Sequence, residues 1–409
     1  MKVVLLNQCF WPDIVSTAQI SHDLGRALVA AGHRVTVISA RSIYGEAGDS
    51  LSPHASIDGI EIIRVRGAMF GKRGILLRLV DFAAFYVRAL VTIMRLPRQD
   101  VVISLTTPPF IALIGIIAGW FKGSRSVYWV MDLYPDTPVA CGVLRPRSPI
   151  TWITERLNRF CMRRSDATVA LGRCMRDLIV SKGIPPSRVH TIQVWSAEEA
   201  HLPSSPASNP YRSEWGIGDR LLVMYSGNFG LGHDVDTMLN AAERLRDDDR
   251  IRFAFVGGGK KKAQVEAFVR ERGLANCILA PYQPRERLEQ LLAAADVHLA
   301  SLSDGVEGIM VPSKVYGMMA SARPSVFIGP AASEVARAIA EAGGGAVIAC
   351  GGVGDLVDCI ARYAADRTLV AEHGRRGRAS LERSYTRQQL CQRWVELLES
   401  LVPNAGRAD

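Results

Sequence analysis

The sequence predicts an α/β protein that contains two doubly wound domains, and three observations support this fold class. The chain opens with an apolar strand pattern over residues 2–7, an amphipathic helix over 16–31 and a second strand over 34–40, which together form a βαβ unit. A second series of strand, glycine-bearing loop and helix begins at residue 220. The chain has 409 residues, which is too many for one hydrophobic core, so two domains are expected.

The first domain continues with short apolar runs, which are typical of buried parallel strands, and with amphipathic stretches. The run PFIALIGIIAGWF over residues 109–121 is too short to span a membrane and is expected to form a core helix. The remaining strands are expected over residues 59–65, 126–131, 166–170 and 188–193, and the remaining helices over 75–96, 151–164 and 173–182.

The domain boundary is expected where the composition changes. Residues 196–210 read SAEEAHLPSSPASNP, and Ser and Pro at this density are typical of a linker. We therefore expect an N-terminal domain over residues 1–195, a linker over 196–213 and a C-terminal domain over 214–385. The C-terminal domain is expected to contain strands over residues 251–256, 277–280, 296–300, 325–328 and 346–348, and a helix over 333–341.

The composition is that of an ordinary globular protein, with 48% hydrophobic and 22% charged residues. The eight cysteines are scattered and form no C-x-x-C pair, which fits a reducing cytoplasm better than a disulfide framework or a zinc site. Met1 and Lys2 lead directly into a strand pattern rather than into a signal peptide. No run of about 20 apolar residues is present, so no membrane-spanning helix is expected. The sequence therefore predicts a cytoplasmic protein.

The formal charge of +9 is distributed unevenly. Residues 64–98 contain eight basic residues and one acid, and residues 122–176 contain ten basic residues and four acids. This asymmetry predicts an anionic partner, which could be nucleic acid, a membrane surface or a phosphorylated acceptor. No aromatic residues alternate with the arginines in the manner of RNA-binding sheets, so nucleic acid is the weakest of the three.

The helix expected over residues 75–96 has two interpretations. It could pack on the sheet with its arginines in solvent, or it could lie with a basic and apolar face on an anionic bilayer. The second interpretation predicts that the protein is attached peripherally to the inner face of the cell membrane. The residues that would then contact the membrane are Arg73, Arg78 and Arg88.

The candidate ligand site centres on DGVEGIMVPSKVYGMMASARP, residues 304–324. Gly305 and Gly308 precede Ser313, which is expected to cap a short helix. A helix start after a glycine-bearing loop presents free N–H groups and a positive dipole end, which suit a phosphate. Lys314 adds a cation. The segment therefore predicts a pyrophosphate site, although the alternative is an ordinary strand–loop–helix junction that binds nothing.

The same segment resembles a known family. LAAADVHLASLSDGVEG and MMASARPSVF are similar to the donor-site segment of the family 4 retaining glycosyltransferases, and VPSKVYGMMASARP resembles the branch that builds bacterial surface polysaccharides, including the colanic-acid and O-antigen enzymes. The resemblance implies the GT-B fold, in which two doubly wound Rossmann-like domains face each other across a cleft. In this architecture the last helix, within residues 386–409, is expected to return to the N-terminal domain.

The resemblance also implies an activity. The chain is expected to move a sugar from a nucleotide-sugar donor, a UDP-sugar, to a lipid-pyrophosphate-linked saccharide, with retention at the anomeric carbon and without a metal or other cofactor. An Asp-x-Asp pair beside a strand is absent from the sequence, in agreement with metal independence. Two alternatives stay open: a non-hydrolysing nucleotide-sugar epimerase of the same fold, and a non-catalytic subunit of a polysaccharide assembly complex.

The resemblance assigns roles on the donor side. Glu307 is expected to hydrogen-bond the transferred sugar, and Lys314 to carry the phosphate charge. Gly317 stands where the family has a glutamate that holds the ribose. The donor-binding residues are expected to be Gly227, Asn228, Gly230, His233, Gly257, Gly258, Lys260, Tyr282, Gln283, Gly308, Ser313 and Tyr316.

Two of these donor-side positions depart from the family. Asn228 and His233 stand where the family has an Arg and a Lys. The missing positive charge is therefore expected from Lys314, with Lys260 as a second candidate. Lys261 and Lys262 are expected to form a solvated helix face.

The acceptor side is expected in the first domain. The loop QCFWPDIVSTAQ ends in Ser16 and Thr17, where the family usually has glycines. Asp132 follows the strand expected over residues 126–131 and begins a Asp-Leu-Tyr-Pro segment that resembles the Asp-Leu-Trp-Pro of the surface-polysaccharide branch. Asp132 is a candidate base for the acceptor hydroxyl. Asp136 is either a further acceptor-side residue or, as we favour, a turn residue.

Overall fold

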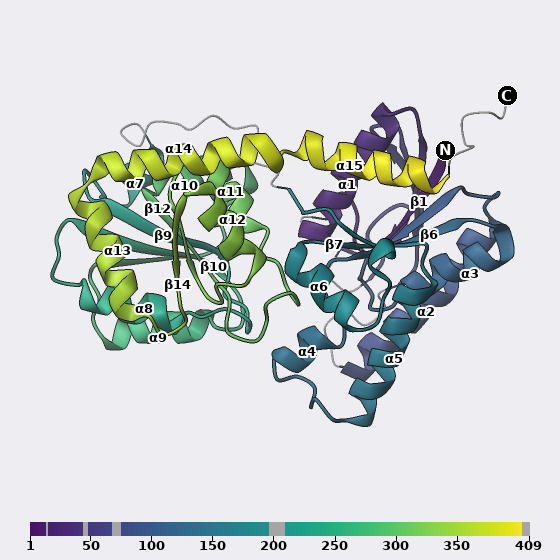
Figure 1. Ribbon diagram of the computed structural model, residues 1–409, viewed down its shortest axis with the longest axis horizontal. Helices are drawn as coiled ribbons and strands as arrows, with labels where there is room; N and C mark the ends of the chain where they lie inside the picture. The colour runs from purple at the N-terminus through teal and green to yellow at the C-terminus, as the bar shows by residue number, and fades with distance from the viewer. Residues whose placement is uncertain (14, 44–47, 68–74, 196–208, 403–409) are drawn as a thin grey trace. The chain divides into compact units, whose positions relative to one another are not determined.

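The computed structural model describes residues 1–402, except residue 14 and residues 44–47, 68–74 and 196–208. The chain forms two compact units (Figure 1). Unit 1 contains Met1–Val194 together with Arg387–Asp409, and unit 2 contains Trp195–Thr386. Each unit is a sheet of mainly parallel strands with helices on both faces, so the predicted fold class is confirmed. Most of the linker expected over residues 196–213 lies outside the described residues.

The sheet of unit 1 has eight strands in the order β3-β4-β2-β1-β5-β6-β7-β8. All described pairs are parallel except β3 with β4. The central strands consist mainly of apolar residues that are buried on both faces, which is typical of a parallel sheet covered by helices. They are β1 (Lys2–Leu6), β2 (Arg34–Ala40), β3 (His54–Ile57), β4 (Ile60–Val65), β5 (Val101–Ser104), β6 (Arg125–Val130), β7 (Ala167–Ala170) and β8 (Val189–Thr191).

Helices cover both faces of this sheet. The helices are α1 (Ser16–Ala30), α2 (Ile75–Arg95), α3 (Ala112–Lys122), α4 (Asp136–Ala140), α5 (Pro149–Arg164), α6 (Arg173–Ser181) and α15 (Arg387–Leu401). Helices α2, α3 and α5 lie side by side on one face, whereas α1 and α15 pack together on the other (Figure 1). Trp394 of α15 is fully buried, and its ring centroid lies 4.5 Å from that of Trp129 in β6. This aromatic contact holds the C-terminal helix in unit 1.

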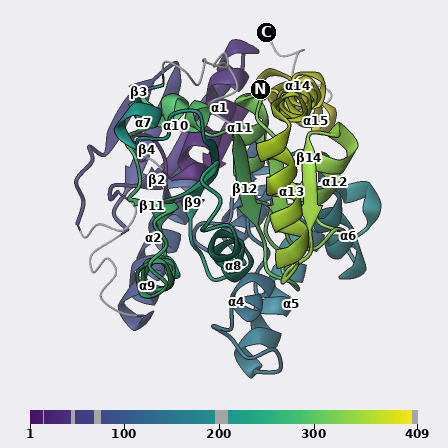
Figure 2. The same ribbon diagram turned by 90° about the vertical axis from the view of Figure 1, so that its left-hand side faces the viewer.

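The sheet of unit 2 has six parallel strands in the order β11-β10-β9-β12-β13-β14. They are β9 (Leu221–Asn228), β10 (Ile251–Gly258), β11 (Cys277–Ala280), β12 (Val297–Ser301), β13 (Ser325–Ile328) and β14 (Gly345–Ile348). Its helices are α7 (Pro210–Glu214), α8 (Asp236–Arg244), α9 (Lys262–Glu271), α10 (Leu288–Ala294), α11 (Lys314–Ala320), α12 (Glu334–Ala342), α13 (Val353–Ala365) and α14 (Arg367–Ser384). Figure 2 views α14 nearly end-on, with α11 and α12 packed beside it.

Several short elements were not predicted from the sequence, among them β3, β5, α4, α7 and α10. Strand β5 was not expected, because its four residues VVIS are too few to show a period. It nevertheless pairs with β1 and β6 in the middle of the sheet. The helix expected from residue 109 begins at Ala112, because Phe110 has a φ of 67° and cannot lie in a right-handed helix.

Helix α2 packs on the sheet of unit 1, which is the first of the two arrangements that the sequence allows. Phe85, Ala89 and Ile93 are buried in a core cluster with β1, β2 and β5. Arg88 donates a hydrogen bond of 2.8 Å to the carbonyl of Arg66. Arg73 and the side chain of Arg78 lie outside the described residues. Within the described parts of the chain, no helix combines the length and hydropathy that crossing a membrane requires.

Candidate functional site

Both sheets contain a point where the strand order reverses. In unit 1, β1 lies between β2 and β5, and in unit 2, β9 lies between β10 and β12. Open α/β sheets bind their ligands in the crevice outside the carboxyl ends of the strands at such a point. The predicted donor residues follow β9, β10, β11 and β12, and therefore lie at the carboxyl edge of unit 2.

The ends of β9 and β10 approach each other closely. Gly227 pairs with Gly257, and Asn228 with Gly258. Gly257 has a φ of 134°, and a Cβ atom at this position would collide with the carbonyl of Gly227. Only glycine permits this backbone arrangement, so the glycines at this edge shape the floor of the site. Asn228 itself is exposed.

Lys314 is the most unusual charged residue of this edge. Its Nζ lies 3.8 Å from the centroid of the Tyr225 ring, and a Cβ atom at Gly227 would lie 3.4 Å from it. The amine is buried and has no hydrogen-bond partner among the described residues. Because burial disfavours the charged form, the pKa of Lys314 falls from 10.5 to about 7. Burying a charged amine without a partner costs free energy. A lysine in a crevice with a strongly shifted pKa is therefore a candidate for binding an anion.

His233 is neutral at pH 7. Its Nδ1 donates a hydrogen bond of 2.6 Å to the carbonyl of Ser301, so Nε2 carries the lone pair. Burial and, to a smaller extent, the charge of Lys314 lower the pKa of His233 to about 4. His233 therefore offers an acceptor for a hydroxyl group and does not replace the cation that the family has here.

Lys261 corrects one of the sequence predictions. It was expected on a solvated helix face, but its Nζ donates a hydrogen bond of 2.6 Å to the carbonyl of His233. It thereby holds the glycine-bearing loop of β9 in place. Lys262 does lie on the helix surface, 3.5 Å from Glu266. Lys260 is exposed at the end of β10.

The loop after β12 carries Glu307. Its backbone is attached to the glycine-bearing loop of β9, because Ser303 donates a hydrogen bond of 2.9 Å to the carbonyl of Gly232. The side chain of Met310 also occupies the space in which a Cβ atom at Gly232 would lie. Glu307 is exposed, and no residue in the described part of the chain forms a hydrogen bond or ion pair with it. Its carboxylate is therefore available to a ligand.

Tyr282 and Gln283 follow β11. The Tyr282 ring lies against Gly258, its hydroxyl donates a hydrogen bond of 3.3 Å to the Gly258 carbonyl, and it is 60% exposed. A flat, exposed ring at this edge suits stacking with a planar base. Gln283 accepts a hydrogen bond of 3.0 Å from the Tyr211 hydroxyl and donates one of 2.9 Å to the Pro281 carbonyl. Both the oxygen and the nitrogen of the Gln283 side chain thus already have hydrogen-bond partners.

Two predictions around α11 are wrong. Ser313 occupies the N-cap position but has helical φ and ψ angles, and its side chain forms no capping hydrogen bond. Tyr316 was expected to bind the donor, but it is buried and its ring centroid lies 5.2 Å from that of Tyr385. Tyr316 is a core residue. Gly308 and Gly317 are also buried.

Asp132 lies two residues beyond the carboxyl end of β6. Burial raises the pKa of its carboxyl group. Among the residues that the structure describes, none donates a hydrogen bond to it. Asp136 differs, because Lys182 lies 2.9 Å from one of its oxygens and 3.0 Å from Glu155. Asp136 begins α4 and is joined through Lys182 to α5 and α6. These contacts favour the structural alternative for Asp136 over the acceptor-side one.

The loop between β1 and α1 is held by a residue that the sequence analysis did not single out. Arg64 of β4 is buried and donates hydrogen bonds to the carbonyls of Trp11 at 3.0 Å and Ser52 at 3.2 Å. The sequence contains a signal for it, because Arg64 follows Ile60 and Ile62 at intervals of two residues and therefore lies on the same buried face of the strand. Ser16 and Thr17 form the first turn of α1, and Ser16 is exposed.

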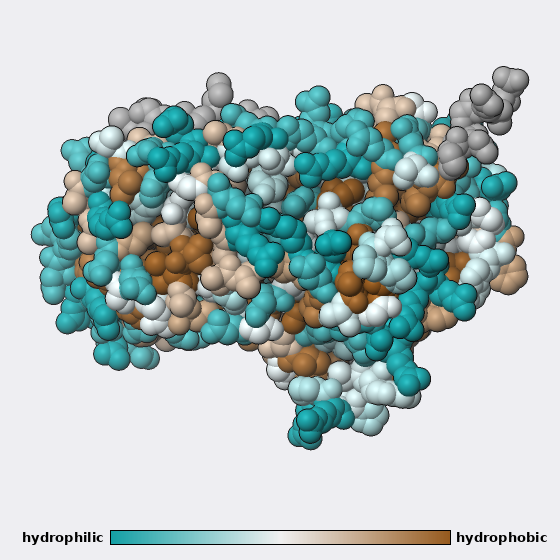
Figure 3. All heavy atoms as spheres, in the orientation of Figure 1, coloured by the Kyte–Doolittle hydropathy of each residue, from teal (hydrophilic) through white to brown (hydrophobic). Residues whose placement is uncertain are grey.

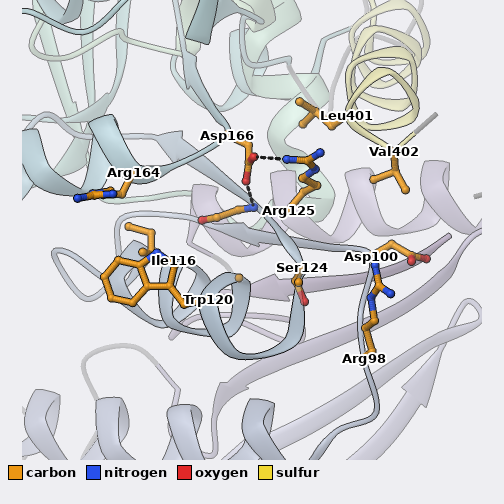
Figure 4. Close-up of a pocket in the computed structure, with 13 residues that line it drawn as sticks. Arg98, Asp100, Ile116, Trp120, Ser124, Arg125, Arg164, Asp166, Leu401 and Val402 are labelled. Carbon is orange, nitrogen blue, oxygen red and sulfur yellow. Dashed lines mark hydrogen bonds and ion pairs between the residues drawn. The ribbon is translucent and has the colours of Figure 1, made fainter. Parts of the chain in front are cut away.

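A groove of about 500 Å³ in unit 1 lies away from this edge. Figure 4 shows its side chains, which include Arg98, Arg125, Arg164 and Trp120. Arg125 lies 2.8 Å from Asp166. These residues surround the amino ends of β5, β6 and β7, opposite the carboxyl edge, so the groove is not part of the candidate site.

Solved structures define the fold. The chain superposes on sucrose-phosphate synthase from Thermosynechococcus elongatus with a TM-score of 0.78 and 13% identity, covering 99% of this chain and 100% of that chain. It superposes on the Anabaena protein HepE in complex with UDP-glucose with a TM-score of 0.73 and 15% identity, covering 98% and 100% of the two chains. The fold is that of the GT-B glycosyltransferases.

Sequence comparisons identify the family. Residues 17–195 match the Glycosyl transferase 4-like domain, and residues 208–380 match the Glycosyl transferases group 1 domain. The chain is 30% identical to WbjE of Pseudomonas aeruginosa, named as a glycosyltransferase, over 61% of this chain and 62% of that protein. It is 25% identical to WcaI of Escherichia coli, named as a colanic acid biosynthesis glycosyl transferase, over 82% and 85% of the two chains. The chain therefore belongs to the glycosyltransferases that combine a Glycosyl transferase 4-like domain with a Glycosyl transferases group 1 domain.

Proposed function

We propose that the protein transfers a sugar from a UDP-sugar to a lipid-pyrophosphate-linked saccharide, with retention at the anomeric carbon, during the synthesis of a bacterial surface polysaccharide. The observation that carries the donor assignment is Lys314, a buried and unpaired amine at the point where the strand order of unit 2 reverses. The complex of HepE with UDP-glucose supports it, because that protein has the same fold.

The donor side of the proposal follows from the described contacts. Lys314 neutralises the charge that grows on the leaving diphosphate. Tyr282 stacks with the base, and the neutral His233 accepts a hydrogen bond from a donor hydroxyl. Glu307 orients the transferred sugar through its hydroxyl groups. With Lys314 in this role, the positions of Asn228 and His233 need no cation.

The acceptor side of the proposal depends on Asp132. A base is more effective when its pKa lies closer to the working pH, and burial moves the pKa of Asp132 in this direction. Asp132 accepts the proton of the acceptor hydroxyl. The loop that contains Trp11, held by Arg64, borders the acceptor. Because the proposed acceptor is lipid-linked, we also propose that the protein works attached to the inner face of the membrane.

Product analysis tests the proposal. The purified chain is incubated with a panel of nucleotide sugars and a membrane extract that contains lipid-linked saccharides, and the products are identified by mass spectrometry. The proposal expects one donor to give a lipid-linked product extended by one sugar, only when the extract is present. An altered nucleotide sugar formed without extract would show an epimerase instead. The absence of any product with all donors would favour the non-catalytic subunit.

A further inference from the structure

The exposed apolar side chains of this protein are concentrated in one region. In the described part of the chain, fourteen large apolar side chains are exposed, and ten of them lie between residues 80 and 160. Concentrated exposed apolar surface marks an interaction site more often than isolated residues do. The ten are Val80, Val87, Val91, Trp120, Phe121, Val143, Ile150, Trp152, Ile153 and Phe160.

The outer face of α5 combines apolar and basic residues. Ile153, Arg156, Phe160 and Arg163 follow one another at intervals of three and four residues, so they lie on one side of the helix. Trp152 next to them is 59% exposed and Ile153 is 56% exposed. In Figure 3, brown apolar atoms lie beside teal hydrophilic atoms in the region of α4 and α5. The core-facing side of α5 carries different residues, Thr151, Asn158, Cys161 and Met162.

Ring contacts extend this face to the end of α3. The ring centroids of Trp120 and Phe160 lie 6.3 Å apart, and Phe121 beside Trp120 is 74% exposed. The guanidinium of Arg156 lies 4.3 Å from the centroid of the Trp152 ring. We call the outer face of α5 and the C-terminal end of α3 the α3–α5 surface.

The α3–α5 surface is strongly basic. The only acid of α5, Glu155, is paired with Lys182. A groove of about 490 Å³ is lined by Arg156, Arg159, Phe160, Arg163 and Arg164. It shares Arg164 with the groove of Figure 4, which adds Trp120, Arg98 and Arg125. Asp100 and Asp166 also line that groove, and Arg125 is paired with Asp166. Arginines that are arranged in this way suit phosphate groups.

We propose that the α3–α5 surface is the docking surface for an anionic phospholipid bilayer. The arginines of its grooves bind the phosphates of the headgroups, and Phe121, Trp152 and Ile153 enter the membrane interface. Aromatic and basic residues together are typical of such interfaces. The inference rests on the proposed lipid-linked acceptor for its purpose. It takes the α3–α5 surface instead of α2 as the main contact, because the exposed residues from Val80 to Val91 of α2 are valines and an alanine, without an exposed basic residue.

Vesicle co-sedimentation of the full chain tests the proposal. One set of vesicles contains equal amounts of phosphatidylglycerol and phosphatidylcholine, and the other contains phosphatidylcholine only. The wild type should bind the anionic vesicles, and salt should weaken the binding. The variant Arg156→Gln, Arg159→Gln, Arg163→Gln and the variant Trp152→Ser, Ile153→Ser should each bind at least about tenfold more weakly. Thermal unfolding of both variants is measured as the control that they fold.

A matched control is available on α2, where Val87 is 63% exposed and Val91 is 40% exposed. The variant Val87→Ser, Val91→Ser should bind vesicles like the wild type. Wild-type binding by both α5 variants, or a loss confined to the α2 variant, would overturn the proposal. So would equal binding of the wild type to neutral and anionic vesicles. Transfer to a water-soluble acceptor analogue is measured separately, so that failure of the proposed transfer reaction leaves the vesicle result interpretable.

Discussion

The carboxyl edges of the two sheets differ in how many of their charged groups already have partners. In unit 1, Asp136 is bound by Lys182 and Arg64 by two backbone carbonyls, and Asp132 is left with no described partner. In unit 2, the charged groups Lys314 and Glu307 are both without partners among the described residues. Since a buried charge is costly unless it is paired, the buried amine of Lys314 prepares unit 2 for an anionic ligand that the protein does not itself supply. Unit 1 contributes a shaped surface and one carboxylate.

We expect the largest effect on the transfer rate from a substitution of Asp132, and a much smaller one from the same substitution of Asp136. Asp132→Asn removes the proposed base without changing its size, and transfer should fall roughly 100-fold or more. Binding of UDP should be unchanged, because the donor residues lie in unit 2. Steady-state transfer rates and isothermal titration calorimetry measure the two quantities.

Asp136→Asn is the matched control for this comparison. It weakens an ion pair that joins three helices, so it should lower the thermal stability more than the turnover of the folded protein. If Asp132→Asn retains the transfer rate of the wild type, Asp132 is not the base. It then has a structural role like that of Asp136.

Lys314→Ala tests the unpaired amine of unit 2. Loss of a charged hydrogen-bond donor should weaken UDP binding by about 1.5–3 kcal/mol. Lys262→Ala is the control, because Lys262 lies on the surface of α9, 3.5 Å from Glu266, and its removal should change the affinity little. Calorimetry that shows equal losses for both variants would indicate a diffuse electrostatic effect rather than a specific phosphate contact.

Glu307→Ala tests whether Glu307 contacts the transferred sugar or the nucleotide. We expect the kcat to fall about tenfold to 100-fold, because a hydrogen bond to the transferred sugar is lost, whereas the affinity for free UDP should stay close to that of the wild type. A similar loss of UDP affinity would instead place Glu307 on the ribose, where the family has a glutamate at the position of Gly317.

The elements with a clear hydrophobic period were predicted from the sequence, whereas several side-chain roles were not. The strands around β9 and β12 follow from runs of apolar residues, and Lys314 follows from its place after a glycine-bearing loop. Arg64 and Lys261 could not be assigned, because their partners Trp11 and His233 lie 53 and 28 residues away in the chain. Ser313 was predicted from a local preference that its backbone angles override. Contacts between distant segments are thus the part that only the fold reveals.

The smallest expected effect is a pH dependence of UDP binding, which tests whether Lys314 is the group that meets the phosphates. The pKa of Lys314 is about 7 in the free protein, and a bound diphosphate stabilises the charged amine and raises this pKa. Below pH 7 the amine is already protonated, so its contribution to binding is complete. Above pH 7 binding must be accompanied by uptake of a proton, and the affinity falls as the pH rises towards the pKa of the complex.

The resulting loss should be about fivefold between pH 7 and pH 8, and calorimetry in buffers of different ionisation enthalpy should detect the proton that is taken up. Lys314→Arg provides the control, because a guanidinium remains charged throughout this range. Its UDP affinity should be nearly constant from pH 7 to pH 8. A fivefold loss that persists in Lys314→Arg would show that another group titrates, and a constant affinity in the wild type would show that Lys314 does not contact the diphosphate.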